Sequence, residues 1–258
     1  MTTVRNFVLL LKAQKCDENN DKYDSKLMQE GFVVKQVKTL EFEYKNLDKL
    51  RISLDEPEKF SGIIFASPRC VIATKLALEG SKINKKWTLK DNFVVGETTA
   101  EKAAQDLDLD CSGKETGNAN NLADILLQDK DKYDKPFLFP HGNLKTDILK
   151  NRIQSELSLH EICMYDTIPN PKVEEELKSV TNCYTSIPEY VVFFSPSGVN
   201  STLSYLKEMN INLMKLVAIG PTTEAAMEQL GLNIYGTAHR PTPDDLLDVI
   251  RGKIKESV

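Results

Sequence analysis

Short apolar runs alternate along the chain with segments whose apolar residues recur at helical spacing. Residues 7–11 form an unbroken apolar run, which is typical of a central parallel strand buried on both faces. Residues 22–30 are predicted to form a helix that ends at Gly31, and residues 32–37 the next strand. Alternating strands and helices predict parallel α/β sheets, whose ligands bind at the carboxyl ends of the strands.

The alternation continues through the rest of the chain. Helices are predicted over residues 69–79, 122–127 and 145–157, and strands over residues 137–139 and 161–165. The chain thus consists of two kinds of segment. One kind is a strand–helix–strand, and the other contains three strand-to-helix junctions. Each kind occurs twice, and the two kinds alternate.

One strand-to-helix junction is duplicated. Residues 63–68 read Ile-Ile-Phe-Ala-Ser-Pro, and residues 191–196 read Val-Val-Phe-Phe-Ser-Pro. A second pair follows, with Gly-Glu-Thr-Thr at residues 96–99 and Gly-Pro-Thr-Thr at residues 220–223. A helix that starts at such a junction presents free backbone N–H groups, which suit an anion. Two matched sets predict two similar domains that face one anionic ligand.

Two domain divisions are compatible with this order. A division into halves would cut the chain near residue 130. The other division places residues 39–169 in one domain and joins residues 1–38 and 170–258 in a second, discontinuous one. Prolines at the second crossing suit an extended linker, and the short polar connector 128–136 is typical of a loop within a domain. These features favour the discontinuous division without settling it.

The composition is that of a globular protein of 258 residues, 41% hydrophobic and 28% charged. Five scattered cysteines without CxxC spacing indicate reduced thiols rather than disulfides or a zinc site. No apolar run is long enough to span a membrane and no leader is visible at the N-terminus, so we expect a cytosolic protein. The net charge is −5 and the basic residues are dispersed, so neither nucleic acid nor a membrane is an expected partner. We expect a monomer, because no exposed apolar helix face is evident.

The motifs of common cofactor sites are missing. The chain contains neither the Gly-x-Gly-x-x-Gly of dinucleotide-binding proteins nor a P-loop, and its three histidines lack the spacing of metal ligands. We therefore expect no nucleotide cofactor and no metal.

The hydroxyl–proline junctions Ser67-Pro68, Ser195-Pro196 and Thr242-Pro243 admit two interpretations. The hydroxyl group can cap the helix, and proline at the first helical position loses no useful donor. Capping alone accounts for any single junction. Repetition at several strand ends also favours a set of donors for a poly-anion, because each carboxylate at a helix N-terminus gains roughly 0.3–1 kcal/mol.

Taken together, these motifs resemble the uroporphyrinogen-III synthase family in its eukaryotic form. The resemblance runs nearly from end to end and rests on the number, order and spacing of motifs that are individually weak. They lie at residues 65–69, 94–96, 117–119, 138–145, 165–167, 193–198, 218–223 and 241–243.

The resemblance implies two similar parallel-sheet α/β domains joined by a two-stranded extended linker, one of them discontinuous. It implies cofactor-free cyclisation of hydroxymethylbilane, a linear tetrapyrrole with acetate and propionate groups on every ring, to uroporphyrinogen III. Water is lost, ring D is inverted through a spiro intermediate, and the enzyme is formally a hydro-lyase. The upstream bilane-forming enzyme is implied as a source of substrate by hand-over. Restricting such a flexible substrate to one ring-closing geometry is a task of positioning.

The resemblance also suggests roles for individual residues. Tyr165 matches a tyrosine that aids departure of hydroxide as hydrogen-bond donor or general acid, whereas its simpler interpretation is packing at the linker. The residues expected to bind substrate supply hydroxyl groups, N–H groups, amides or cations. They are Ser67, Arg69, Gly96, Thr99, Asn118, Gly142, Asn143, Ser195, Ser197, Gly198, Lys215, Thr222 and Thr223.

Two residues depart from the pattern. Glu97 stands where the second copy has Pro221, and its charge would repel a nearby carboxylate. His141 stands where relatives are expected to have a small residue such as cysteine, and the favoured interpretation is a surface histidine. A non-catalytic two-domain protein that binds a poly-carboxylate is the alternative function.

Overall fold

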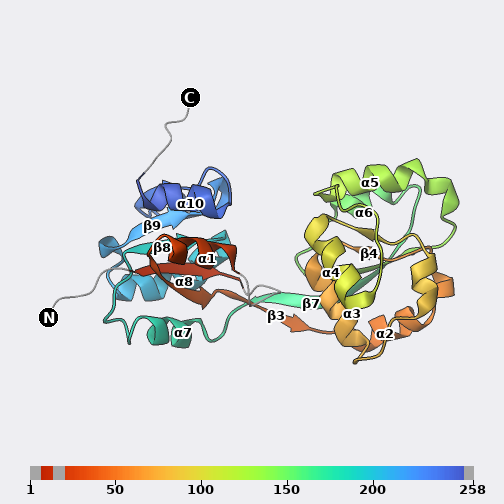
Figure 1. Cartoon of the computed structure of the whole chain (residues 1–258), viewed down its shortest axis with the longest axis horizontal. Helices are drawn as coiled ribbons and strands as arrows, with labels where there is room; N and C mark the ends of the chain where they lie inside the picture. Colours follow the sequence, from red (N-terminus) through yellow and green to blue (C-terminus); the bar gives the residue numbers. More distant parts are fainter. Residues whose placement is uncertain (1–6, 14–20, 253–258) are drawn as a thin grey trace. The chain divides into compact units, whose positions relative to one another are not determined.

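The computed structural model describes residues 7–13 and 21–252. The chain divides into two compact units, unit 1 (Met1–Glu41 with Ile168–Val258) and unit 2 (Phe42–Thr167). Both are layered α/β structures with parallel strand pairs (Figure 1), and the predicted fold class is confirmed. Strands β3 (Leu40–Tyr44) and β7 (Leu159–Pro169) are neighbours in one sheet, and each passes from one unit into the other.

Unit 1 contains a five-stranded sheet in the order β10-β9-β8-β1-β2. All four pairings between neighbouring strands of this sheet are parallel. The central strand β1 is buried over its whole length, as its unbroken apolar run predicts. The strands are β1 (Phe7–Lys12), β2 (Val33–Lys38), β8 (Tyr190–Phe193), β9 (Lys215–Ala218) and β10 (Ile234–Thr237).

Helices cover both faces of this sheet. Alternate residues of β1 point to opposite faces, so Leu9 packs in one core cluster and Leu10 in the other. Helices α7 (Val173–Val180), α8 (Pro196–Glu208) and α9 (Pro221–Gln229) contribute to the first cluster. Helices α1 (Lys22–Gln29) and α10 (Pro243–Ile250) contribute to the second.

Unit 2 is built around shorter strands. Strand β6 (Phe137–Gly142) pairs with β7 in parallel, and β4 (Ile64–Phe65) pairs with β5 (Phe93–Val94) in parallel. A parallel bridge between Ile63 and Leu138 joins the two pairs into one layer. The carboxyl ends of these strands therefore meet at one edge.

The helices of unit 2 again lie on two faces. Helices α2 (Leu47–Asp55), α3 (Pro68–Ala77) and α4 (Glu97–Leu107) pack in the core cluster that includes Trp87. Helices α5 (Ala119–Gln128) and α6 (Ile148–Ile153) pack in the cluster on the other face. Short 3₁₀ turns lie at Pro57–Lys59, Lys85–Leu89, Lys130–Lys132 and Ile211–Leu213.

Two predicted elements differ in length from the observed ones. The helix predicted over residues 145–157 is reduced to α6, because residues 143–147 form the turn that leaves β6. The strand predicted over residues 161–165 is extended to β7, because it gains β6 and β3 as neighbours. Both differences arise from tertiary contacts.

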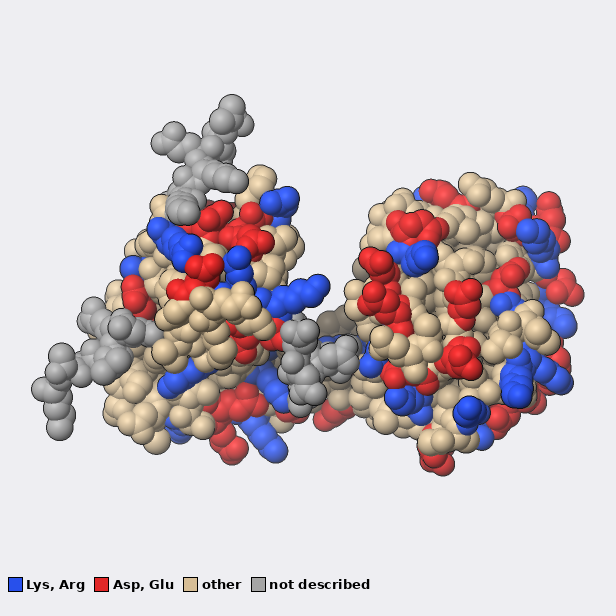
Figure 2. All heavy atoms as spheres, viewed as in Figure 1, with Lys and Arg blue, Asp and Glu red and all other residues tan. Residues whose placement is uncertain are grey.

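Charges of both signs are mixed over each unit. On the face drawn in Figure 2, Lys and Arg side chains are interspersed with Asp and Glu. Within residues 7–13 and 21–252, no helix is long and apolar enough to cross a membrane. The same residues contain no group of three His, Cys, Asp or Glu side chains placed to hold a metal ion.

Candidate functional site

Unit 2 contains a pocket of about 350 Å³. It lies where β4 and β6 end and α3 begins, at the carboxyl edge that parallel sheets use for ligands. Three predicted site residues, Ser67, Gly142 and Tyr165, line it together. Its other polar lining residues are Cys70, His141, Lys145, Thr146 and Thr167.

Tyr165 is held in one place by its neighbours. The side chain is 9% exposed, and its ring lies edge-on to Phe42 and Tyr44, with centroid separations of 5.9 and 6.2 Å. Gly142 lies against the ring, so that a Cβ at this position would come within 2.4 Å of Tyr165 Cε2. Glycine is therefore required here by close approach.

The Tyr165 hydroxyl is a neutral donor. Burial raises the pKa of Tyr165 to about 12, an effect that Cys70 reinforces and that Ser67 and Arg69 oppose. The hydroxyl oxygen lies 3.4 Å from Ser67 Oγ. A phenol that keeps its proton at neutral pH can donate to an oxygen that leaves a ligand.

Ser67 serves the pocket rather than its own helix. It precedes α3 with extended backbone angles, but its side chain makes no capping bond. Its Oγ lies 3.4 Å from both Tyr165 Oη and Cys70 Sγ. The predicted capping role of Ser67 is therefore wrong, because a partner from β7 competes for the hydroxyl group.

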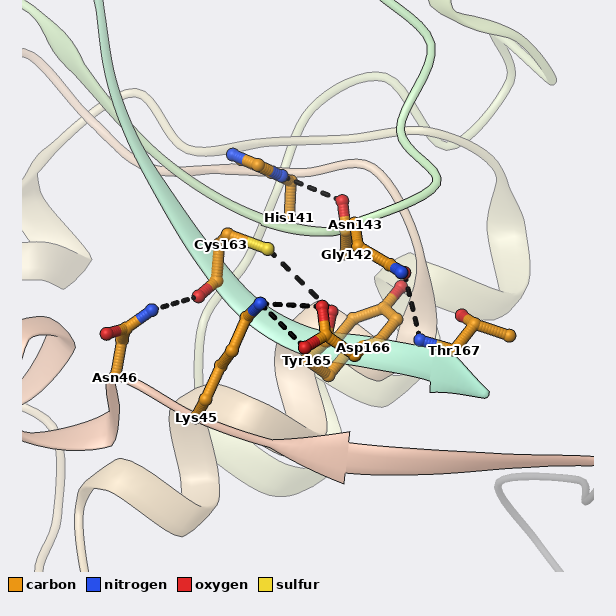
Figure 3. A network of polar contacts seen from close by, with 9 residues as sticks. All are labelled: Lys45, Asn46, His141, Gly142, Asn143, Cys163, Tyr165, Asp166 and Thr167. Atoms are coloured by element: carbon orange, nitrogen blue, oxygen red, sulfur yellow. Dashed lines mark hydrogen bonds and ion pairs between the residues drawn. The ribbon is translucent and has the colours of Figure 1, made fainter. Parts of the chain in front are cut away.

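A polar network fixes the strand that carries Tyr165 (Figure 3). The Asn143 backbone N–H donates to the Tyr165 carbonyl at 3.0 Å, and Asn143 Oδ1 accepts from the Thr167 N–H at 2.9 Å. On the β3 side, Lys45 Nζ lies 2.6 Å from Asp166 Oδ1. Asn143 thus acts on the backbone that flanks Tyr165, and its side-chain oxygen is engaged within the protein.

His141 is not the surface residue that its sequence position suggested. It is 9% exposed, lines the pocket, and places Nδ1 2.8 Å from the Gly142 carbonyl oxygen. Burial lowers the pKa of His141. The surface interpretation is wrong because β6 continues to Gly142 and carries His141 into the interior.

Other predicted residues of unit 2 lie at helix starts around the same edge. Gly96 is the residue immediately before α4 and has a φ of 83°, a conformation that suits glycine. Asn118 caps α5 by accepting from the Asn121 N–H at 3.0 Å. The Arg69 guanidinium carbon lies 3.1 Å from the centroid of the Phe42 ring.

The threonine pairs repeat one geometry in both units. Thr99 and Thr223 are only 2% and 3% exposed, whereas Thr98 and Thr222 are exposed. Thr99 Oγ1 donates to the Val95 carbonyl at 2.9 Å. A binding role for the hydroxyl groups of Thr99 and Thr223 is therefore not supported, since the buried member of each pair packs inward.

In unit 1 the junction before α8 gathers three predicted residues. Ser195 Oγ accepts from the Gly198 N–H at 3.1 Å and lies 3.0 Å from Ser197 Oγ. Ser197 is exposed, whereas Gly198 is buried. The capping role predicted for Ser195 is confirmed.

Lys215 does not join these residues. It is the first residue of β9, whereas Ser195 and Thr222 follow the last residues of β8 and β9. Its Nζ lies 3.0 Å from Glu189 Oε1 and 3.1 Å from the Tyr190 hydroxyl oxygen. The structure does not bring Lys215 together with the junction residues, because Lys215 lies at the start of a parallel strand and the junction residues follow the ends of such strands.

A family model described as uroporphyrinogen-III synthase HemD matches residues 21–248 of the chain. This match spans both units and every junction discussed above. The chain belongs to the uroporphyrinogen-III synthase family.

Two curated relatives carry the same family name. The uroporphyrinogen-III synthase of Saccharomyces cerevisiae is 26% identical over 153 residues, which are 54% of this chain and 54% of that protein. The enzyme of that name from Schizosaccharomyces pombe is 26% identical over 160 residues, 61% of each chain. The matched part thus spans between about half and three-fifths of these relatives.

Solved structures of family members show the same fold. The uroporphyrinogen-III synthetase of Helicobacter pylori 26695 matches 96% of this chain and 100% of its own, with a TM-score of 0.62 and 16% identity. A mutant uroporphyrinogen III synthase of the extremely thermophilic bacterium Thermus thermophilus matches 96% of this chain and 98% of its own, with a TM-score of 0.52 and 13% identity. Both support the two-unit α/β architecture of the family.

Five polar pocket residues were not predicted as site residues, namely Cys70, His141, Lys145, Thr146 and Thr167. Cys70 follows Ser67 by three positions, which places both on one face of the first turn of α3. Lys145 lies inside a motif that marked the family, and His141 was noted only as a departure from it. The helical spacing at Cys70 was a signal that could have been used.

Proposed function

We propose that the chain is a uroporphyrinogen-III synthase, a cofactor-independent hydro-lyase that converts hydroxymethylbilane to uroporphyrinogen III. Family membership supports this assignment. The observation that carries it is the buried Tyr165 phenol, which stays protonated at neutral pH at the wall of a pocket. This group is suited to assist departure of a hydroxyl group.

In the proposed reaction, the hydroxymethyl C–O bond breaks while Tyr165 Oη donates to the departing oxygen, which leaves as water. The electron-rich pyrrole supplies the electrons for this cleavage. The freed methylene carbon attacks the substituted α-carbon of ring D and forms a spiro intermediate. The bond from that α-carbon to the bridge carbon of ring C then breaks, and the bridge carbon bonds to the unsubstituted α-carbon of ring D, which closes the macrocycle with ring D inverted. The unsubstituted α-carbon of ring D loses its proton after this last bond forms, which restores the phenol, so the net change is loss of one water molecule.

Ser67 and Gly142 are proposed to position the reacting group. Gly142 permits the Tyr165 ring to lie at the end of β6, and Ser67 Oγ holds the orientation of the hydroxyl group at 3.4 Å. Such positioning matters because misplacement by about 1 Å can cost on the order of 10²-fold in rate.

The helix N-termini are proposed to bind carboxylate groups of the substrate. Asn118, Ser197 and Thr222 are exposed at the starts of α5, α8 and α9. A carboxylate at such a site gains roughly 0.3–1 kcal/mol, so each unit can contribute to binding of an anion despite the acidic net charge. Gly96 and Arg69 belong to the same proposed set in unit 2.

The remaining proposals concern the domain limits, the cellular location, the oligomeric state and the delivery of substrate. Residues 1–38 with 170–258 and residues 39–169 are proposed as the two domains, close to the limits of units 1 and 2. The cysteines at 70, 111, 163 and 183 are free, which fits the reducing cytosol. We propose a monomer that receives its reactive substrate by hand-over from the bilane-forming enzyme.

The decisive experiment incubates purified protein with freshly generated hydroxymethylbilane and separates the isomers of the product. The proposal expects uroporphyrinogen III in excess of the spontaneous type I isomer. Formation of type I alone, at the uncatalysed rate, would contradict it and return the chain to a binding role.

A further inference from the structure

The pocket of unit 2 has the size and lining of a site for one ring. Its volume of about 350 Å³ lies at the lower end of the roughly 300–1,000 Å³ that small-molecule sites occupy. Much of the wall is apolar, including Val95, Phe139 and Leu149. A flat aromatic ring fits such a wall, whereas a chain of four substituted rings exceeds the volume.

The charge at this pocket is already balanced. Lys145 Nζ lies 2.5 Å from Asp147 Oδ1 and 2.8 Å from Glu161 Oε1, and Lys150 also pairs with Glu161 at 2.8 Å. Two lysines thus face two carboxylates. The pocket therefore favours the uncharged part of a ligand over its carboxylate groups.

One ring nitrogen of His141 has no assigned partner. The Gly142 carbonyl can only accept, so Nδ1, at 2.8 Å, must carry the hydrogen. The neutral imidazole then leaves Nε2 with a lone pair. Within the part of the chain that the structure describes, no group hydrogen-bonds to Nε2. His141, which lines the pocket, thus offers an acceptor nitrogen because the backbone carbonyl of Gly142 fixes the tautomer of its ring.

We propose that this pocket binds a single pyrrole ring and that His141 Nε2 accepts the hydrogen bond from its N–H. This inference rests on the proposed function and makes the pocket the subsite for one terminal ring of the substrate. A pyrrole offers one N–H donor on an otherwise apolar plane, which matches one acceptor on an apolar wall. Tyr165 and Ser67 then face the substituent of the same ring.

The proposal has a consequence for pH. Protonation of Nε2 would convert the acceptor into a donor and abolish the bond. Burial and Lys145 lower the pKa of His141 from its usual value of about 6.5, whereas the Gly142 carbonyl, Glu161 and Asp147 raise it. Burial is the largest of these effects, so Nε2 stays unprotonated at neutral pH and binding falls as the pH drops through the lowered pKa.

A monopyrrole tests the pocket without the cyclisation reaction. Porphobilinogen, which has one acetate and one propionate group, is titrated into the ¹⁵N-labelled protein while the imidazole nitrogens are observed by NMR. The chain has three histidines, so substitution assigns each signal. We expect His141 as the Nδ1–H tautomer, with an Nε2 signal that shifts on binding. An Nε2–H tautomer, or an Nε2 signal that does not move, would overturn the proposal.

A matched pair of variants separates the two ring nitrogens. His141→Asn keeps an amide near Nδ1 for the Gly142 carbonyl but has no distal acceptor. His141→Gln places an amide oxygen near the position of Nε2. Loss of one hydrogen bond weakens binding of porphobilinogen roughly 2- to 10-fold in the Asn variant, and the Gln variant recovers most of it without the decline at low pH. The exposed His160→Asn serves as control and should bind like wild type.

The outcomes also separate this inference from the proposed function. Wild-type protein that forms uroporphyrinogen III, but in which the Asn and Gln variants bind porphobilinogen equally, contradicts only the role of His141. Protein that forms the type I isomer alone but binds porphobilinogen at His141 contradicts only the synthase activity.

Discussion

The serine of the Ser-Pro junction makes different side-chain contacts in the two units. Ser67 before α3 and Ser195 before α8 have nearly the same backbone angles, with φ of −161° and −164° and ψ of 159° and 157°. Ser195 Oγ caps its helix at the Gly198 N–H. Ser67 Oγ instead contacts Tyr165 and Cys70.

The difference comes from two neighbouring positions. Three residues after the serine, unit 1 has Gly198 and unit 2 has Cys70, whose Sγ itself lies against the serine hydroxyl group. Unit 2 also brings Tyr165 to the junction from β7. A repeated motif thus specifies a repeated backbone, while its side-chain chemistry depends on residues outside the motif. Unit 1 keeps the cap, and unit 2 makes the hydroxyl group part of a pocket.

The largest effect is expected when the phenol is removed. Tyr165→Phe deletes the donor to the leaving oxygen, and general acid groups contribute on the order of 10²- to 10⁴-fold in rate. We therefore expect kcat to fall within that range while affinity for uroporphyrinogen III changes little. Steady-state kinetics and product binding by calorimetry measure the two quantities.

Two controls compare this variant with the rest of the molecule. Tyr133→Phe removes a hydroxyl group that contacts Asp91 at 3.1 Å, away from the pocket, and should leave kcat unchanged. Thr222→Val in unit 1 should raise KM rather than lower kcat, since it removes a binding group. A Tyr165→Phe enzyme with normal kcat would contradict the proposal that unit 2 contributes the catalytic group and unit 1 only binding groups.

The next largest effect concerns the two glycines at the pocket and at the α8 junction. Gly142→Ala would place a Cβ 2.4 Å from the Tyr165 ring, whereas the Cβ of Gly198→Ala would lie 3.3 Å from Ser195 Oγ. We expect Gly142→Ala to lose roughly 10²-fold in kcat/KM because the phenol is displaced. Overpacking should also lower the free energy of unfolding by about 1–3 kcal/mol.

Gly198→Ala is the matched variant and should cost well under tenfold in kcat/KM. Kinetics and urea unfolding of both proteins provide the measurement. Equal losses in the two variants would mean that close packing, rather than the position of Tyr165, explains the requirement for glycine.

The smallest effects are expected for the two serines. Ser195→Ala should have the larger effect on stability, and Ser67→Ala the larger effect on activity. Ser195→Ala removes a cap and should lower the free energy of unfolding by about 0.5–2 kcal/mol, whereas Ser67→Ala removes none. Conversely, Ser67→Ala should lower kcat more than Ser195→Ala does. Urea unfolding and hydrogen exchange of the Gly198 amide report the first effect. A cap-like loss of stability in Ser67→Ala would contradict the comparison.

Features governed by local sequence could be predicted well. The run at residues 7–11 is buried on both faces, the helix over residues 22–30 is α1, and Asn118 and Thr242 cap their helices. Each depends on neighbours within a few positions. The position of Lys215 could also have been inferred. The first residue of a parallel strand lies at the amino end of that strand, away from the carboxyl ends where the junction residues lie.

Which side chains line the pocket could not be predicted from neighbouring residues in the sequence. His141 is buried because β6 extends three residues beyond the predicted end at Phe139 and reaches Gly142, a length decided by pairing with β7. The choice between Thr98 and Thr99 depends on which face of α4 packs in the core. Both are decided by contacts between segments that are distant in the sequence.

The place of β1 between β2 and β8 has a consequence during synthesis on the ribosome. Strand β2 emerges soon after β1, but β8 begins only at Tyr190, after the whole of unit 2 has been made. One edge of the buried strand β1 therefore stays unpaired while more than half of the chain is translated. An unpaired apolar edge can pair with other chains, so shielding of β1 by a chaperone would protect the nascent protein until β8 is made.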